Sequence, residues 1–239
     1  MDLKFRKSLL ANLSELQIRT ARAWWAYGLL ALFVNLTGTP AAAAGTLRLL
    51  ALGDSLTAGY NLPPADSFPS RLEAALVAEG YSVQVINAGV SGDTTAGGRA
   101  RLEWVLSADA APDAAIVALG ANDALRGIDP AIAYDNLDAI LTTLQRRHVK
   151  VLLAGMLAPR NLGADYAKAF DAIYPRLSAA HGVPLYPFFL DGVALHSELV
   201  QADGMHPTAP GVAVMVRNIL PAVNSLLGPP PAPPPGGRR

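Results

Sequence analysis

Apolar residues follow two kinds of pattern that alternate along the chain from residue 47 to residue 227. One is a short, nearly continuous apolar run, which is typical of a strand buried on both faces of a parallel sheet. The other repeats apolar residues at helical spacing, often behind a capping residue or a first-turn proline. The runs predict strands at 47–52, 83–86, 114–119, 149–153 and 183–186. The repeats predict helices at 67–79, 100–106, 129–144, 167–177 and 210–227.

Strands that alternate with helices at this spacing indicate right-handed crossover connections and therefore a parallel sheet. We expect an α/β fold, a three-layer α/β/α sandwich with a central parallel sheet of about five strands. In such sheets the ligand binds beyond the carboxyl ends of the strands. The polar residues that follow the strands are therefore the candidates for chemistry.

Three predicted strands end in segments that could carry a reaction. Ser55 follows the first strand, where it can be a nucleophile or can merely cap the turn. The loop after the second strand, 87–95, contains glycines whose backbone N–H groups can approach an oxyanion, or which simply shape the connection. Asn122 follows the third strand, and its amide can donate to a developing negative oxygen, although a lone asparagine is also a common turn former.

A carboxylate and an imidazole lie three residues apart near the end of the chain, at Asp203 and His206. A carboxylate that orients a histidine general base would serve Ser55, whereas a capped loop is the plainer alternative. The pair could also ligate a metal, but the other three histidines, His148, His181 and His196, fall in separate segments. We expect neither a metal nor a cofactor.

The composition narrows the function classes. The 239 residues are 51% hydrophobic, which suits one domain with a full core. Lys+Arg and Asp+Glu number 19 each, so the balance gives no electrostatic case for a nucleic-acid partner. The absence of cysteine excludes a disulfide framework, a thiolate nucleophile and a cysteine-based metal site.

Both ends of the chain differ from its middle. Residues 1–22 are basic, 23–34 are apolar and 39–45 are small, which is the order of a secretory signal. We predict cleavage near Ala44 and an exported, periplasmic or secreted protein, with an uncleaved N-terminal membrane anchor as the alternative. The domains are then a signal peptide or anchor at 1–44, one folded domain at 46–228 and an extended proline-rich tail at 229–239, which could also be a ligand for a proline-recognition domain.

Four blocks of residues, in this order, resemble the SGNH or GDSL hydrolases. The blocks are Gly53-Asp54-Ser55-Leu56, Gly92, Gly120-Ala121-Asn122-Asp123 and Asp203-Gly204-Met205-His206. The resemblance runs over about residues 50–227. Segments 87–94, 169–175 and 183–189 are similar to exported bacterial arylesterases and to the multifunctional acyl thioesterase and lysophospholipase.

The resemblance implies a flavodoxin-like strand order and a role for each matching residue. Ser55 would be the nucleophile, His206 the base and Asp203 its orienting partner. The oxyanion hole would comprise the backbone N–H groups of Ser55 and Gly92 and the side chain of Asn122. Segment 156–166 resembles a mobile loop that lies against the acyl chain, which makes Met156, Leu157 and Pro159 candidate substrate-binding residues.

The predicted activity is hydrolysis of aryl or acyl esters, extending to thioesters and lysophospholipids, through an acyl-enzyme on Ser55. Apolar residues at 62–64, 188–189 and 195 border the predicted site and favour acyl or aryl groups over sugars, unless they only pack against the sheet. The alternatives are a carbohydrate O-acetyl esterase and a non-catalytic binding module of the cell envelope. A phosphate-directed hydrolase would need a cation, and we expect the nearest ones, Arg99 and Arg101, on a helix that faces solvent. The expected partners are small ester substrates and lipid, with no nucleic acid, in a monomer or small homo-oligomer.

Overall fold

The core of the protein is a parallel sheet in the strand order β2-β1-β3-β4-β5. The computed structural model describes residues 45–107 and 111–230, all within one unit, Gly45–Pro233. The predicted leader and nearly all of the proline-rich tail lie outside the described residues and stay predictions. The strands are β1 (Leu47–Gly53), β2 (Val83–Gly89), β3 (Ala114–Ala118), β4 (Lys150–Ala154) and β5 (Leu185–Tyr186).

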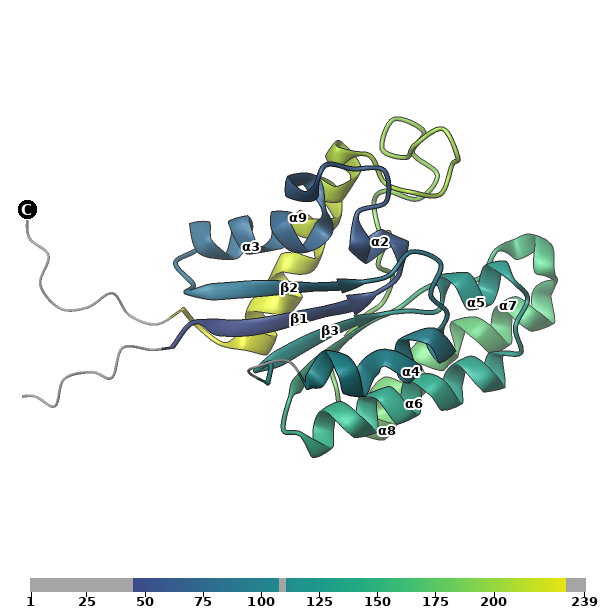
Figure 1. Cartoon of the computed structure of the whole chain (residues 1–239). Helices are drawn as coiled ribbons and strands as arrows, with labels where there is room; N and C mark the ends of the chain where they lie inside the picture. Colours follow the sequence, from purple (N-terminus) through teal and green to yellow (C-terminus); the bar gives the residue numbers. More distant parts are fainter. Residues whose placement is uncertain (1–44, 108–110, 231–239) are drawn as a thin grey trace, which may run out of the picture. The chain divides into compact units, whose positions relative to one another are not determined.

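Helices cover both faces of the sheet (Figure 1). One face carries α3 (Phe68–Ala78) and α9 (Ala209–Leu227). The other face carries α4 (Thr95–Leu106), α6 (Pro130–Arg146) and α8 (Ile173–His181). This is the predicted three-layer sandwich, and its strand order is the flavodoxin-like one. The shorter elements are α2 (Ser55–Ala58), η1 (Pro64–Asp66), α5 (Ala121–Leu125), η2 (Arg160–Leu162) and α7 (Ala164–Asp171).

The predicted strands and helices are present, but several boundaries differ. Strand β2 continues to Gly89 because its last residues pair with the end of β1, which local sequence does not reveal. Strand β5 is only two residues long because Pro184 and Pro187, which have no N–H to donate, flank it. The predicted helix at 167–177 is two helices, α7 and α8. Pro175 lies in the first turn of α8, where a missing N–H is tolerated.

Two apolar residues that define predicted helices do not lie in the core. Val77 on α3 and Ile132 on α6 are each 53% exposed. On α3 the buried stripe is Phe68, Leu72 and Leu76, at a spacing of four, and Val77 points about 100° away from it. The helices themselves are present, but these two residues lie outside their buried faces.

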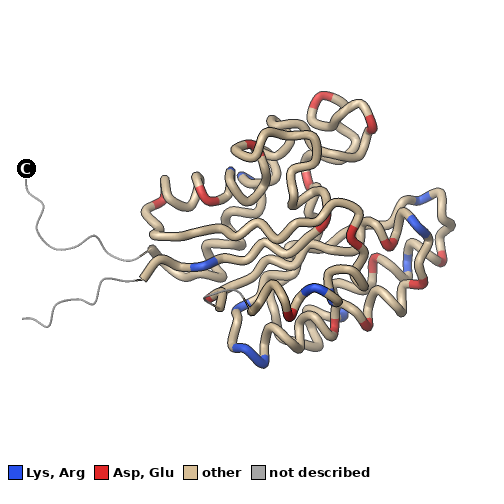
Figure 2. Tube along the Cα trace, viewed as in Figure 1, with Lys and Arg blue, Asp and Glu red and all other residues tan. Residues whose placement is uncertain are grey.

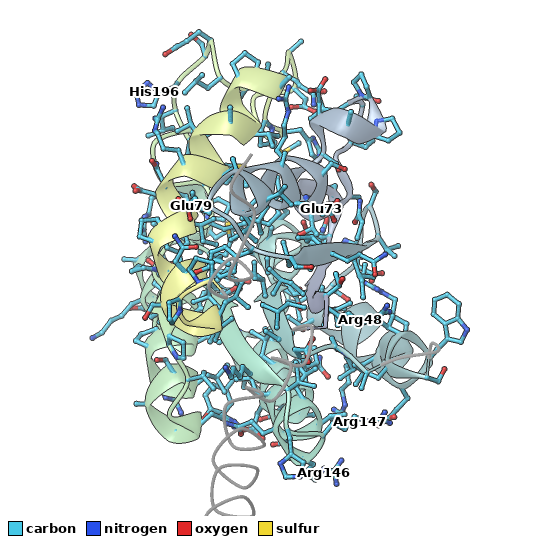
Figure 3. The ribbon with its side chains drawn as sticks, turned by 90° about the vertical axis from the view of Figure 1, so that its left-hand side faces the viewer. Arg48, Glu73, Glu79, Arg146, Arg147 and His196 are labelled. Atoms are coloured by element: carbon cyan, nitrogen blue, oxygen red, sulfur yellow. The ribbon has the colours of Figure 1, made fainter. Side chains whose placement is uncertain are left out.

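Charged residues lie mainly on the helices and loops around the sheet (Figure 2). Figure 3 shows the end of the sheet where the strands begin, with Glu73 beside β2. The Glu73 carboxylate accepts the Val85 N–H at 2.7 Å, and the Asn87 side chain accepts the Gly89 N–H at 3.0 Å. These side chains occupy backbone donors of an edge strand, which reduces its capacity to pair with another chain.

The packing of α2 on β2 gives a direct test of the fold. A Cβ on Gly89 would lie 2.3 Å from the Ala58 backbone nitrogen, so we expect Gly89→Ala to push α2 away from the sheet. The free energy of unfolding should fall by about 1–3 kcal/mol, the usual cost of overpacking, as measured by urea denaturation. Gly45→Ala, where no atom of the described residues lies within 4 Å of the added Cβ, is the control and should unfold like the wild type. Equal midpoints for both variants would contradict the α2–β2 contact.

Candidate active site

Ser55 is the first residue of α2, directly beyond the carboxyl end of β1. The turn between strand and helix is tight, because a Cβ on Gly53 would lie 2.0 Å from Thr57 Oγ1 and 2.9 Å from the Ala118 carbonyl oxygen. Asp54 caps the helix by accepting the Leu56 N–H at 3.0 Å. The sequence therefore turns sharply at a glycine and presents the Ser55 hydroxyl at the edge of the sheet.

The structure joins Ser55 to the two polar residues predicted near the end of the chain. His206 Nε2 lies 2.9 Å from Ser55 Oγ, and His206 Nδ1 lies 2.7 Å from Asp203 Oδ2. Both Asp203 and His206 lie in the loop that precedes α9. The arrangement is a hydroxyl, an imidazole and a carboxylate in series, which is the geometry of an activated serine nucleophile.

Asp203 is held in its ionised form by its own loop. Its Oδ1 accepts the backbone N–H groups of His206 at 3.0 Å and Met205 at 2.9 Å. These two bonds, together with the side-chain bond to His206, lower the pKa of Asp203 to about 2. Because a carboxylate only accepts, the Nδ1 of His206 must carry a proton, which leaves Nε2 of the neutral imidazole free to accept the Ser55 hydroxyl proton.

Contacts that the sequence did not reveal hold the histidine loop in place. The Tyr60 ring lies against the His206 ring, with centroids 4.4 Å apart. The Gln201 N–H donates to the His206 carbonyl at 2.7 Å, and the Gln201 side chain donates to the Tyr60 carbonyl at 2.9 Å. Gln201 is 141 residues from Tyr60 in sequence, so no local pattern could have predicted this link.

The two predicted oxyanion donors outside Ser55 lie on neighbouring loops. Asn122 lines the same cavity as Ser55 and His206. Its Nδ2 donates to the Asp93 carbonyl at 2.9 Å and lies 3.5 Å from Asp54 Oδ2. Gly92 directly precedes Asp93 and has a φ of +83°, which favours glycine. Gly92 is exposed and is not among the residues that line the cavity, so the structure places Asn122 in the site and Gly92 beside it.

A cavity of about 300 Å³ opens at Ser55 and is mostly apolar. Its lining includes the predicted Met156, Leu157 and Pro159, and also Leu195. The residues at 62–64 and 188–189 do not line it. Phe189 is 1% exposed and packs edge-on against Phe68 at 4.9 Å, so for Phe189 the alternative of packing in the core was right. The remaining apolar lining residues were not predicted to line the site. They are Leu56, Ala121, Ala124, Leu125, Leu190, Ala194, Val200 and Met205.

One of the two arginines predicted to face solvent does not. Arg99 is exposed on α4, but the side chain of Arg101 is only 18% exposed. Its guanidinium donates to the Gly53 carbonyl at 3.0 Å, the Ala88 carbonyl at 2.8 Å and the Asp93 carboxylate at 2.6 Å. The Arg101 guanidinium therefore links the ends of β1 and β2 to the loop that follows β2.

The other histidines lie apart from the site. His181 contacts Asp138 at 2.8 Å, and His196 lies 3.4 Å from Glu198. Within residues 45–107 and 111–230 no three His, Cys, Asp or Glu side chains gather as metal ligands would. The positions His148, His181 and His196 thus form no cluster in the described part of the chain.

A parallel sheet in flavodoxin-like order, with a serine, a histidine and an aspartate in series at its carboxyl edge, defines a serine-hydrolase type of site. Residues 51–214 match the GDSL-like Lipase/Acylhydrolase family, and the chain belongs to this family, as the resemblance predicted. It is 41% identical over 167 residues to the arylesterase of Vibrio mimicus, which is 70% of this chain and 83% of that protein.

Two further relatives are similar over most of their length. The chain is 39% identical over 197 residues to thioesterase 1/protease 1/lysophospholipase L1 of Escherichia coli strain K12, covering 81% of this chain and 92% of that protein. The crystal structure of AlinE4, an SGNH-hydrolase family esterase, is 50% identical with a TM-score of 0.65, covering 77% of this chain and 98% of that chain. The predicted likeness to arylesterases and to the acyl thioesterase and lysophospholipase is thereby confirmed, whereas export stays a prediction.

Asp54 makes the stability of the protein depend on pH. Its side chain is 1% exposed, and desolvation raises its pKa to about 6 against an ordinary 3.8, although the Leu56 N–H and His206 oppose the shift. Between these two values the folded state binds more protons than the unfolded state, so wild-type stability falls as the pH rises. For Asp54→Asn, which does not titrate, the unfolding free energy relative to wild type should rise by about 2–3 kcal/mol from about pH 4 to pH 7.

Denaturant titrations at several pH values check this dependence on Asp54. Asp135→Asn, which removes an exposed carboxylate from α6, is the control and should show a small, flat difference. If the Asp54→Asn difference were also flat, burial would not be raising the pKa of Asp54.

Proposed function

We propose that this protein is a serine hydrolase that cleaves aryl and acyl esters of carboxylic acids through an acyl-enzyme on Ser55. The observation that carries the proposal is the series of hydrogen bonds Ser55–His206–Asp203, at 2.9 and 2.7 Å, at the mouth of an apolar cavity. Family membership and the esterase relatives support the same reaction class.

In the proposed reaction His206 Nε2 accepts the hydroxyl proton as Ser55 Oγ attacks the ester carbonyl carbon. The negative oxygen of the tetrahedral intermediate receives hydrogen bonds from the N–H groups of Ser55 and Gly92 and from the Asn122 amide. The intermediate collapses, the bond to the alcohol oxygen breaks, and the alcohol leaves with the proton that His206 returns. Water, deprotonated by His206, then hydrolyses the acyl-enzyme, and Ser55 regains its proton.

The cavity favours an apolar acyl or aryl group. Of the described residues that line it, Ser55, Asn122 and His206 are the polar ones, and none is a lysine or arginine that could hold a phosphate. An ester with a short to medium acyl chain would bury that chain against Met156, Leu157 and Pro159. The names of two relatives, an arylesterase and a thioesterase and lysophospholipase, make aryl esters, thioesters and lysophospholipids the first substrates to compare.

The reaction class is tested with p-nitrophenyl esters from acetyl to palmitoyl, using the full chain and its Ser55→Ala variant. We expect a rate optimum at intermediate acyl length and a loss of at least about a thousandfold in kcat for Ser55→Ala, since triad nucleophiles contribute at this scale. Activity confined to acetyl esters, with acetate released from acetylated polysaccharide, would indicate a carbohydrate esterase. No activity and no labelling by a fluorophosphonate probe would indicate a binding module.

The position of the acyl chain is tested by filling the cavity. Ala194 lines it, so Ala194→Phe should shift the optimum to shorter acyl chains and lower kcat/KM for the longest productive ester about tenfold or more, with little change for acetyl. Ala131→Phe, at an exposed position on α6, is the control of equal size. Unchanged chain-length profiles in both variants would show that the acyl group binds elsewhere.

A further inference from the structure

The oxyanion donors come from strands that are not neighbours in the sheet. Gly92 follows β2 and Asn122 follows β3, and β1 lies between these two strands. Two strand spacings correspond to about 10 Å, so sheet hydrogen bonds alone do not bring the two loops together. They must be joined above the end of β1, which is where Ser55 lies. The described structure contains such a connection, and it involves residues that the reaction does not use.

The connection is a pair of hydrogen bonds between Thr95 and Asp123. The Thr95 N–H donates to Asp123 Oδ2 at 2.8 Å, and the Thr95 hydroxyl donates to Asp123 Oδ1 at 2.6 Å. Thr95 is the first residue of α4 and lies three positions after Gly92, whereas Asp123 directly follows Asn122. A third bond, from Asn122 Nδ2 to the Asp93 carbonyl, runs between the same two loops.

The environment of this pair is closed. Thr95 is 0% and Asp123 is 1% exposed. Asn136 on α6 donates to Thr95 Oγ1 at 3.2 Å, and Arg99 donates to Asn136 Oδ1 at 3.2 Å. Within the described residues both carboxyl oxygens of Asp123 are occupied by Thr95, and no lysine or arginine donates to them.

Burying a carboxyl group costs desolvation free energy, so a gain in stability does not by itself explain why Asp123 is buried. Replacing a buried hydrogen-bonded pair by apolar groups of similar shape is often neutral for stability, so stability does not by itself require an acid at this place. What the pair supplies is two directed bonds that fix the start of α4 relative to the start of α5. Donors in an oxyanion hole must lie 2.7–3.1 Å from the developing oxygen. A shift of about 0.5 Å between the two loops would therefore take a donor out of hydrogen-bond range.

We propose that Asp123 is a positioning residue which, through its two hydrogen bonds to Thr95, holds Asn122 and Gly92 at the spacing that the oxyanion requires. Asp123 itself touches neither substrate nor reacting atoms. The inference rests on the proposed function, because it assigns to Asp123 a role in the same reaction.

The test is a double-mutant cycle in the full chain, with kcat and KM measured on p-nitrophenyl butyrate. Asp123→Asn and Thr95→Val are each made in the wild type and in Asn122→Ala. In the wild type we expect kcat to fall roughly 10- to 100-fold with KM changed less than about threefold, since losing a whole donor costs about 100- to 1,000-fold. In the Asn122→Ala background the same substitutions should cost several-fold less, because one of the donors that they misplace is already absent.

The controls separate positioning from general damage. Thr95→Ser keeps both bonds to Asp123 and should retain most of the wild-type kcat. Asp129→Asn changes a carboxylate that caps α6 by accepting the Ala131 N–H at 2.9 Å, and it should leave kcat unchanged. Thermal unfolding of every variant gives the folded fraction. If Asp123→Asn does not fold, Thr95→Val still tests the pair, because it loses the hydroxyl bond but keeps the backbone N–H bond to Asp123.

Two results would overturn the inference while leaving the proposed function in place. One is a wild-type kcat for both Asp123→Asn and Thr95→Val. The other is an equal loss in the two backgrounds, which would mean that the pair acts independently of Asn122. If Asn122→Ala itself kept wild-type turnover, the oxyanion assignment would fail first, and the role of Asp123 would fail with it.

Discussion

The register of β1 between its two neighbours determines where the site can form. Gly53, the last residue of β1, pairs with Gly89 of β2 on one side and with Ala118 of β3 on the other, so three strands end at the same level. The loops that leave them carry Ser55, Gly92 and Asn122. Because the strands are parallel, these loops gather at one edge of the sheet. A slip of register by one residue would move every side chain of β1 to the opposite face and separate Ser55 from its partners.

Two aspartates of the site have opposite environments, and this difference assigns their chemistry. Asp203 lies in a loop whose N–H groups stabilise its charge and keep its pKa near 2. Asp54 is enclosed by the turn after β1, where desolvation raises its pKa to about 6. Of these two aspartates, Asp203 is the one that contacts the imidazole, so the carboxylate with the lowered pKa fixes the histidine tautomer. Asp54 instead accepts a backbone N–H, that of Leu56, and so caps the helix that begins with Ser55.

The sequence predicts those parts of the protein that depend on near neighbours in the chain. Strand hydrophobicity, the turn at Ser55 and the three-residue spacing of Asp203 and His206 are local, and the structure contains all of them. Arg101 was misjudged because its acceptors are carbonyls up to 48 residues away, at the ends of two strands. The cavity wall was predicted only in part, because an apolar residue such as Phe189 can face either the core or the site, and only packing decides which.

The polar groups around Ser55 are held by other protein groups before any substrate arrives. Asn122 donates to a backbone carbonyl, Arg101 has its donors engaged, and Asp203 and His206 are fixed by their own loop. Little reorganisation is then needed when negative charge develops on the substrate oxygen, which is the condition under which oxyanion donors are most effective. The loop between β5 and α9 carries Asp191, Glu198 and Asp203 but no lysine or arginine, and Figure 2 shows acidic segments on it. The same loop contributes Leu190, Ala194 and Leu195 to the cavity, whose described lining includes no lysine or arginine.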